Sequence, residues 1–171
     1  MSRFVAFLRG VSPMNLKMAD LKHCMEAAGF TEVKTILSSG NVAFNSSTRK
    51  EESIAQTIEA QLQQQLGRSF PVTVRSVAHL QHLLASDPFS RHQVPAGAKQ
   101  VITFLWKPPD VKLKLPIEYE GVTIHQVQGL EAFTSYIPHP KGPVFMSLLE
   151  KTFGKDQTTR TWETVKKCFV A

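Results

Sequence analysis

The order of apolar runs and helical repeats in the sequence predicts an α+β protein with antiparallel sheets and helices packed on one face of each sheet. The first half reads strand, helix, strand, strand, helix, strand, which is the βαββαβ order of a ferredoxin-like unit. The second half repeats this order in a degenerate form, without a sequence repeat that can be aligned. The 171 residues suit one domain or two small subdomains.

The first four elements follow from apolar spacing and turn residues. Residues 4–8 are apolar in succession and predict a strand buried on both faces. Residues 18–28 carry apolar side chains at helical spacing, and Gly29 follows as a stop. Residues 33–37 and 42–44 flank a cluster of turn formers, so we expect a hairpin there.

A second helix is predicted by a capping box, because Thr48 stands three residues before Glu51. We therefore expect the helix to start at Thr48 and to end at Gly67. Its apolar stripe has a spacing of four and consists of Ile54, Ile58, Leu62 and Leu66.

The first half closes with a strand and a short helix. Residues 71–75 predict the strand, and Ser76 is a suitable N-cap for a helix over residues 77–84. The dipeptide Asp87-Pro88 terminates this helix, because proline disfavours helical backbone in the residue before it.

The second half opens with a buried strand at residues 101–106. Prolines at 108, 109 and 116 exclude a regular helix where the first half has one, and they predict a linker or extended excursion. Residues 122–127 and 132–137 predict a second hairpin around Gly129.

Two helices are expected at the carboxyl end. One starts at Pro143 and ends at Gly154, and a last short helix carries Trp162, Val165 and Phe169. We therefore predict two ferredoxin-like subdomains, residues 1–85 and a degenerate copy at 86–171, that share a sheet or a core.

Composition narrows the class of protein. A hydrophobic fraction of 42% with 20% charged residues is typical of a globular chain and excludes a disordered one. Cys24 and Cys168 have no metal-ligand spacing, which indicates a reduced, cytoplasmic protein. The apolar run near the amino end is too short for a signal peptide or a membrane span, so we expect no membrane partner.

The net charge of +6 favours negatively charged partners, nucleic acid or a phosphorylated small molecule. Residues 1–85 hold nine basic and six acidic side chains, and residues 86–171 hold eleven and eight, so each half carries +3. This even division excludes a basic tail.

The loop after the first strand is the first candidate site. It carries Arg9, Gly10, Asn15 and Lys17 just before a helix, where unpaired N–H groups and the helix dipole favour anions. The alternative is an ordinary surface loop in which Gly10 supplies a positive φ.

The predicted first hairpin carries the second candidate, in which Ser39, Gly40 and Asn41 could present hydroxyl and amide groups to a ligand. The alternative is a simple turn. No base stands at an interpretable spacing from Ser39, so a nucleophilic role has no support.

A third candidate lies at the expected start of the last helix. Arg160 suits a planar anion, Trp162 suits ring stacking, and Thr159 adds a hydroxyl. The alternative is that a threonine caps the helix while Trp162 packs inward.

Motifs for catalysis and cofactors are missing from the sequence. It contains no catalytic motif, P-loop, dinucleotide fingerprint or zinc motif. We therefore assign no catalytic residue and no metal ligand, expect no cofactor, and favour a protein that is not an enzyme.

Several strings in this order resemble the domain of unknown function 1697 family, which consists of uncharacterised, mainly bacterial proteins. They are Phe7-Leu8-Arg9-Gly10-Val11, Lys17-Met18, Ala28-Gly29-Phe30, Ser39-Gly40-Asn41-Val42, Pro88-Phe89 and Thr158-Thr159-Arg160 with Trp162. The resemblance implies a duplicated α+β structure with two ferredoxin-like subdomains and no established activity. The family's glycine-rich first loop is replaced by residues 12–16 here, and its asparagine before the tryptophan is Thr161.

Three functions are compatible with the sequence. The first is a binding module for an anionic ligand, with nucleic acid among the candidates, in which Arg9, Lys17 and Arg160 make contacts and Trp162 stacks. Aromatic side chains on the central strands could stack on RNA bases, but we expect them in the core; they are Phe4, Phe7 and Phe44.

The second function is an enzyme or sensor for a small phosphorylated metabolite, bound in a cleft between the subdomains. It requires Arg9, Asn41 and Arg160 to converge. The third is a protein-interaction scaffold. The oligomeric state does not follow from the sequence.

Overall fold

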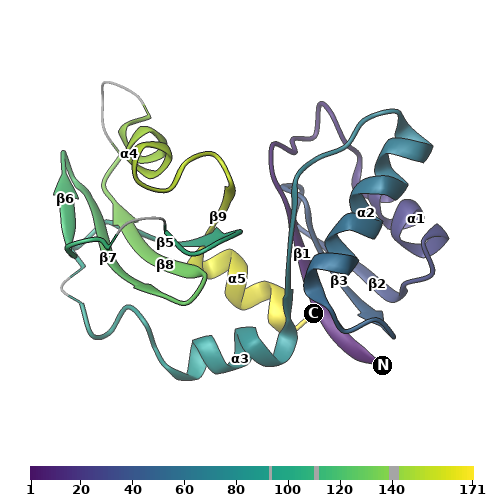
Figure 1. Ribbon diagram of the computed structural model, residues 1–171, viewed down its shortest axis with the longest axis horizontal. Helices are drawn as coiled ribbons and strands as arrows, with labels where there is room; N and C mark the ends of the chain where they lie inside the picture. The colour runs from purple at the N-terminus through teal and green to yellow at the C-terminus, as the bar shows by residue number, and fades with distance from the viewer. Residues whose placement is uncertain (93, 110–111, 139–142) are drawn as a thin grey trace. The chain divides into compact units, whose positions relative to one another are not determined.

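The computed structural model of the protein describes residues 1–92, 94–109, 112–138 and 143–171. The chain divides into two compact units. Unit 1 comprises Met1–Ala85 together with Lys166–Ala171, and unit 2 comprises Ser86–Val165. The strands form two separate antiparallel sheets, one in each unit (Figure 1). The predicted α+β class with antiparallel sheets is thereby confirmed.

Unit 1 contains a complete ferredoxin-like arrangement. Its elements are β1 (Ser2–Leu8), α1 (Met18–Ala27), β2 (Thr31–Ile36), β3 (Asn41–Ser46), α2 (Glu51–Leu66) and β4 (Val72–Ser76). The strand order in the sheet is β2-β3-β1-β4, so β1 lies between β3 and β4 and is antiparallel to both. This confirms the βαββαβ prediction for the first half.

The core of unit 1 lies between one face of its sheet and helices α1 and α2, which Figure 1 shows together on that face. Alternate residues of β1, Phe4, Ala6 and Leu8, point into this core, as the period of two in a strand requires. From α2 the predicted stripe enters it through Ile54 and Ile58. The sequence pattern therefore identified the buried face of this helix correctly.

The opposite face of the same sheet contains buried polar side chains among apolar ones. Asn41, Thr73 and Arg75 are at most 9% exposed. Helix α3 (Val77–Ala85) begins directly after β4, and the hydroxyl of Ser76 accepts a 3.1 Å hydrogen bond from the N–H of His79. The predicted N-cap is confirmed.

The carboxyl terminus belongs to unit 1 and is attached to β1 by Arg3. The Nε of Arg3 donates to the carbonyl of Ala171 at 3.0 Å, and its Nη1 donates to the carbonyl of Glu32 and to Asn45 Oδ1 at 3.1 and 2.9 Å. One guanidinium thus connects β1, β2, β3 and the last residue of the chain.

In its described residues, unit 2 repeats the arrangement with one helix fewer and one strand more. Its elements are β5 (Lys99–Leu105), β6 (Ile117–Tyr119), β7 (Val122–Gln128), β8 (Glu131–Tyr136), α4 (Val144–Phe153) and β9 (Gln157–Thr161). The strand order is β6-β7-β8-β5-β9, and without β6 it is the order of unit 1. The degenerate ferredoxin-like prediction is confirmed.

The proline-rich stretch before β6 is where the sequence excluded a regular helix. Its described residues form no helix, although residues 110–111 lie outside the described part of the chain. Helix α4 covers one face of the sheet, where Phe145 and Leu149 pack with Val101 and Ile124. As far as unit 2 is described, it thus has a single helix on this face, where unit 1 has two.

Two local predictions are wrong. Helix α2 begins at Glu51 with Lys50 as its N-cap, because the main chain of Thr48 is hydrogen-bonded instead to the hydroxyl of Ser46, at 2.9 and 3.1 Å. Residues 157–161 form strand β9 rather than the start of a helix, because all five pair with residues 101–105 of β5.

Candidate functional site

The loop after β1 (residues 9–17) and the turn between β2 and β3 meet at one end of the unit 1 sheet. The N–H of Leu8 donates to the carbonyl of Gly40 at 2.9 Å, and the N–H of Arg9 donates to the carbonyl of Pro71 at 2.9 Å. The two residues at which β1 ends and the loop begins, Leu8 and Arg9, are therefore hydrogen-bonded to two other chain segments. Two of the predicted binding segments lie beside each other in unit 1.

Asn15 closes the loop on itself. Its Oδ1 accepts from the N–H of Ser12 at 2.8 Å, and its Nδ2 donates to the carbonyl of Gly10 at 2.8 Å. The N–H groups of Asn15 and Leu16 both donate to the carbonyl of Ser12 at 3.1 Å. The side-chain amide of Asn15 thus has a structural role. Gly10 has a φ of +80°, which is the positive φ expected if residues 9–17 are an ordinary surface loop.

Asn41 and Gly40 shape the neighbouring turn. Asn41 is 0% exposed, and its Nδ2 donates to the carbonyl of Ile36 at 3.0 Å and to Ser39 Oγ at 2.9 Å. Gly40 has a φ of +87°, and a Cβ there would lie 3.0 Å from both Leu8 Cβ and Val11 Cγ2. These residues permit the two segments to approach each other closely.

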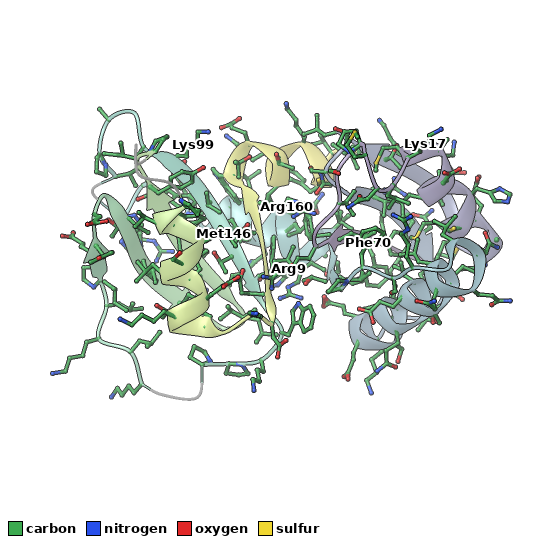
Figure 2. The ribbon with its side chains drawn as sticks, turned by 90° about the horizontal axis from the view of Figure 1, so that it is seen from above. Arg9, Lys17, Phe70, Lys99, Met146 and Arg160 are labelled. Carbon is green, nitrogen blue, oxygen red and sulfur yellow. The ribbon has the colours of Figure 1, made fainter. Side chains whose placement is uncertain are left out.

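The cationic side chains of the loop do not gather at one point. Figure 2 shows Arg9 and Lys17 well apart within unit 1. Lys17 is exposed and is the N-cap residue of α1. It has a neighbour that the sequence did not reveal, because exposed Arg68 donates from Nη1 to the carbonyl of Asn15 at 3.0 Å. Lys17 and Arg68 therefore place two exposed cations at the carboxyl end of the loop.

Charge is concentrated in unit 1. Its 91 residues hold eleven lysine and arginine side chains and six acidic ones, a net +5, whereas unit 2 holds nine and eight, a net +1. The net charge is equal in residues 1–85 and 86–171, but it is unequal in the two units because Lys166 and Lys167 belong to unit 1. The basic character of the protein is a property of this unit.

The third candidate segment belongs to unit 2. Thr159 and Arg160 lie in edge strand β9, and Arg160 is half-buried with Nη1 donating to the carbonyl of Thr159 at 2.8 Å. The hydroxyl of Thr161 accepts from the N–H of Thr164 at 3.3 Å and so caps helix α5 (Trp162–Phe169).

Trp162 is packed rather than displayed. It is 6% exposed, and its ring centroid lies 5.8 Å from that of Phe89. It borders a pocket of ≈ 350 Å³ whose charged lining residues, Lys99 and Glu163, have opposite signs. The structure thus favours the inward-packing alternative, and the ring has too little exposed surface to stack on a ligand.

The expected convergence of Arg9, Asn41 and Arg160 involves residues of both units, and it stays a prediction. The central phenylalanines have a clear outcome. Phe4, Phe7 and Phe44 are all buried, so none of them forms an aromatic platform for RNA bases.

Unit 2 contains a histidine pair that the sequence did not reveal. The rings of His92 and His125 stack with centroids 5.1 Å apart and an interplanar angle of 23°. His125 Nε2 and Ser135 Oγ share a hydrogen bond of 2.8 Å. Burial lowers the pKa of His125 from its ordinary 6.5, His92 lowers it further, and Glu118 acts in the opposite direction.

The described part of the chain contains neither a metal-binding cluster nor a membrane-spanning helix. Within the described ranges, three or more His, Cys, Asp or Glu side chains never gather in a way that could bind a metal ion. In the same part of the chain, every helix is too short or too polar to cross a membrane.

Comparison with known proteins assigns the chain to a family. Conserved bacterial protein SP0830 from Streptococcus pneumoniae has a similar structure, with a TM-score of 0.68 over 99% of this chain and 97% of that chain. The two sequences are 18% identical, so this likeness shows the fold alone. No significant match was found among curated protein sequences. The family model described as "Protein of unknown function (DUF1697)" matches residues 1–128, and the chain belongs to this family.

Proposed function

We propose that the protein is a binding module for an anionic ligand and that unit 1 provides the binding surface. The observation that carries this proposal is the net charge of +5 on unit 1, against +1 on unit 2. Within unit 1, Lys17 and Arg68 are exposed beside the hydrogen-bonded loop of residues 9–17. A rigid loop reduces the ordering that a ligand would otherwise have to impose.

Nucleic acid is the ligand class to test first, and phosphates rather than bases are the groups to be contacted. The phenylalanines of β1 and β3 are buried and so provide no stacking platform in unit 1. Lysine and arginine side chains bind phosphates without regard to sequence, so we expect little sequence preference. Arg9 and Arg160 remain proposed additional contacts.

The test is fluorescence anisotropy with a labelled single-stranded oligonucleotide over a series of salt concentrations. The logarithm of the affinity should fall linearly with the logarithm of the salt concentration. Lys17→Ala and Arg68→Ala should each reduce this slope by about 0.7, the value for one phosphate contact on a single strand. Lys151→Ala is the matched control, since Lys151 is exposed on α4 of unit 2.

Two results would reject the proposal in this form. One is absence of binding at low salt, and the other is an equal loss of slope in the Lys151→Ala control. If a phosphorylated metabolite raises the melting temperature while the oligonucleotide does not bind, the protein is instead the small-molecule enzyme or sensor considered above.

A further inference from the structure

A short segment between α3 and β5, here called the strap (residues 86–92), is attached to the unit 2 sheet by an aromatic anchor. Phe89 is buried, and its ring centroid lies 6.1 Å from that of Phe133 and 5.8 Å from that of Trp162. Phe133 is paired with Ile102, and neither residue belongs to the core beneath α4. The strap therefore packs on the sheet face opposite α4.

The second anchor of the strap is His92. Its N–H donates to the carbonyl of Phe89 at 3.2 Å, which joins the two anchors in one turn. Its ring stacks on His125, and its Nε2 lies 3.3 Å from Gln126 Oε1. His92 thus places a polar side chain of the strap against two neighbouring side chains of β7, His125 and Gln126.

An irregularity in β7 explains how two successive side chains of one strand reach the same ring. The β7–β8 register shifts between Ile124 and Gln126. In a regular strand His125 and Gln126 would point to opposite faces, whereas a bulge lets neighbours share a face. His125 is then fixed by its 2.8 Å hydrogen bond to Ser135.

We propose that the stacked pair His92–His125 is a pH-sensitive latch, which keeps the strap on the sheet while His125 is neutral and releases it when His125 is protonated. Release moves His92 away and exposes His125 to water. A proton on His125 is then no longer opposed by burial or by the neighbouring His92. Protonation and release therefore favour each other, as linkage requires.

The surrounding charges do little to oppose this release. Glu118 on β6 is the acidic group that acts on His125, and it is exposed, so solvent screens its effect. The strap itself contributes exposed Arg91 next to His92 and exposed Asp87. The sheet neighbours of Ser135, which are Gln100 on β5 and Thr123 on β7, are neutral.

The test is an NMR pH titration of the full chain, with amide hydrogen exchange measured at each pH. His125 should titrate below 6.5, the ordinary pKa of histidine. Exchange protection of the His92 N–H, corrected for the intrinsic rate, should fall by up to about tenfold per pH unit below pH 6.5. Protection of the Ile102 and Phe133 amides should not change, because those strands stay paired.

Two variants remove the latch in different ways. His125→Gln keeps a side chain that can bond Ser135 but removes the titration, so strap protection should no longer depend on pH. His92→Gln is the second variant in case the first does not fold, because His92 is half-exposed. It should raise the titration midpoint of His125 and weaken the pH dependence of strap protection, because the burial of His125 remains. His82→Gln is the control and should behave as the unmodified protein does.

Three outcomes would overturn the proposal. His125 could titrate at or above pH 6.5, strap protection could stay constant while His125 titrates, or protection could fall equally in both variants. The first would mean that the pair does not resist protonation. The other two would mean that protonation does not release the strap.

Discussion

Replacing Gly40 by alanine is predicted to destabilise unit 1 more than the same change at Gly10. The two glycines have similar positive φ values, +87° and +80°, so the backbone strain of an alanine should be similar at both, about 1–2 kcal/mol. Their surroundings differ. A Cβ at Gly40 would lie 3.0 Å from Leu8 Cβ and Val11 Cγ2, whereas nothing lies within 4 Å of the same position at Gly10.

The difference in free energy follows from the neighbours of Gly40. Leu8 is fully buried in β1 and cannot move without disturbing the sheet. Forcing a methyl group into such a contact costs about 1–3 kcal/mol in addition to the strain. We therefore expect a loss of about 2–5 kcal/mol for Gly40→Ala and about 1–2 kcal/mol for Gly10→Ala.

The unfolding of unit 1 can be measured separately from that of unit 2, because the two units contain different side chains that report on unfolding. Both cysteines are buried in unit 1, and both tryptophans and both tyrosines are in unit 2. Thiol labelling across a urea series therefore follows unit 1, whereas tryptophan fluorescence follows unit 2. Equal labelling midpoints for Gly40→Ala and Gly10→Ala would refute the packing argument. Adding Val11→Ala should recover part of the Gly40→Ala loss, since it removes the Cγ2 contact.

Three further predictions concern other parts of the chain. Burial, and to a smaller extent Asp20, raises the pKa of the Cys24 thiol. Maleimide should therefore label Cys24 far more slowly in the native protein than in the unfolded one. Equal labelling rates would show that the native protein has an accessible thiolate. Because the pKa of His125 is lowered, the unfolded state binds more protons than the folded state below pH 6.5. The free energy of unfolding of unit 2 should therefore fall as the pH drops below 6.5, by at most about 1.4 kcal/mol per pH unit. His125→Gln should flatten this profile, and an unchanged profile would assign the effect to other groups. Arg3→Ala removes three hydrogen bonds and should cost about 1–3 kcal/mol, with faster carboxypeptidase trimming from Ala171; an intact terminus would contradict this account.

Most elements could be predicted because each carries its own pattern. The stripe of Ile54, Ile58 and Leu62 needs no partner to be recognised, and neither does the hairpin signal at Gly129. Strand β9 was missed because its sequence, Gln157–Thr161, has no apolar alternation. An edge strand of this kind is defined by its pairing with β5, which is a property of the tertiary structure.

The candidate sites were harder to predict because their parts are distant in the sequence. Arg68 reaches the loop through a hydrogen bond to Asn15, 53 residues away. His92 meets His125 only because the strap folds back and a bulge alters β7. The hydroxyl of Ser46 likewise engages Thr48, although the spacing of Thr48 and Glu51 suits a capping box. Sequence spacing alone could not distinguish these competing partners.

Unit 1 is the more basic unit partly because the last six residues of the chain belong to it. Variants in this region can therefore distinguish an effect of charge on ligand binding from an effect of a loosened terminus. The last six residues return Lys166 and Lys167 to unit 1, where Arg3 secures the terminus. Replacing both lysines by alanine lowers the charge of unit 1 from +5 to +3 and leaves the Arg3 bonds in place. Arg3→Ala lowers the charge by one and also loosens the terminus. If binding follows charge, the lysine variant should bind the oligonucleotide more weakly than Arg3→Ala; if it follows the order of the terminus, the ranking should reverse.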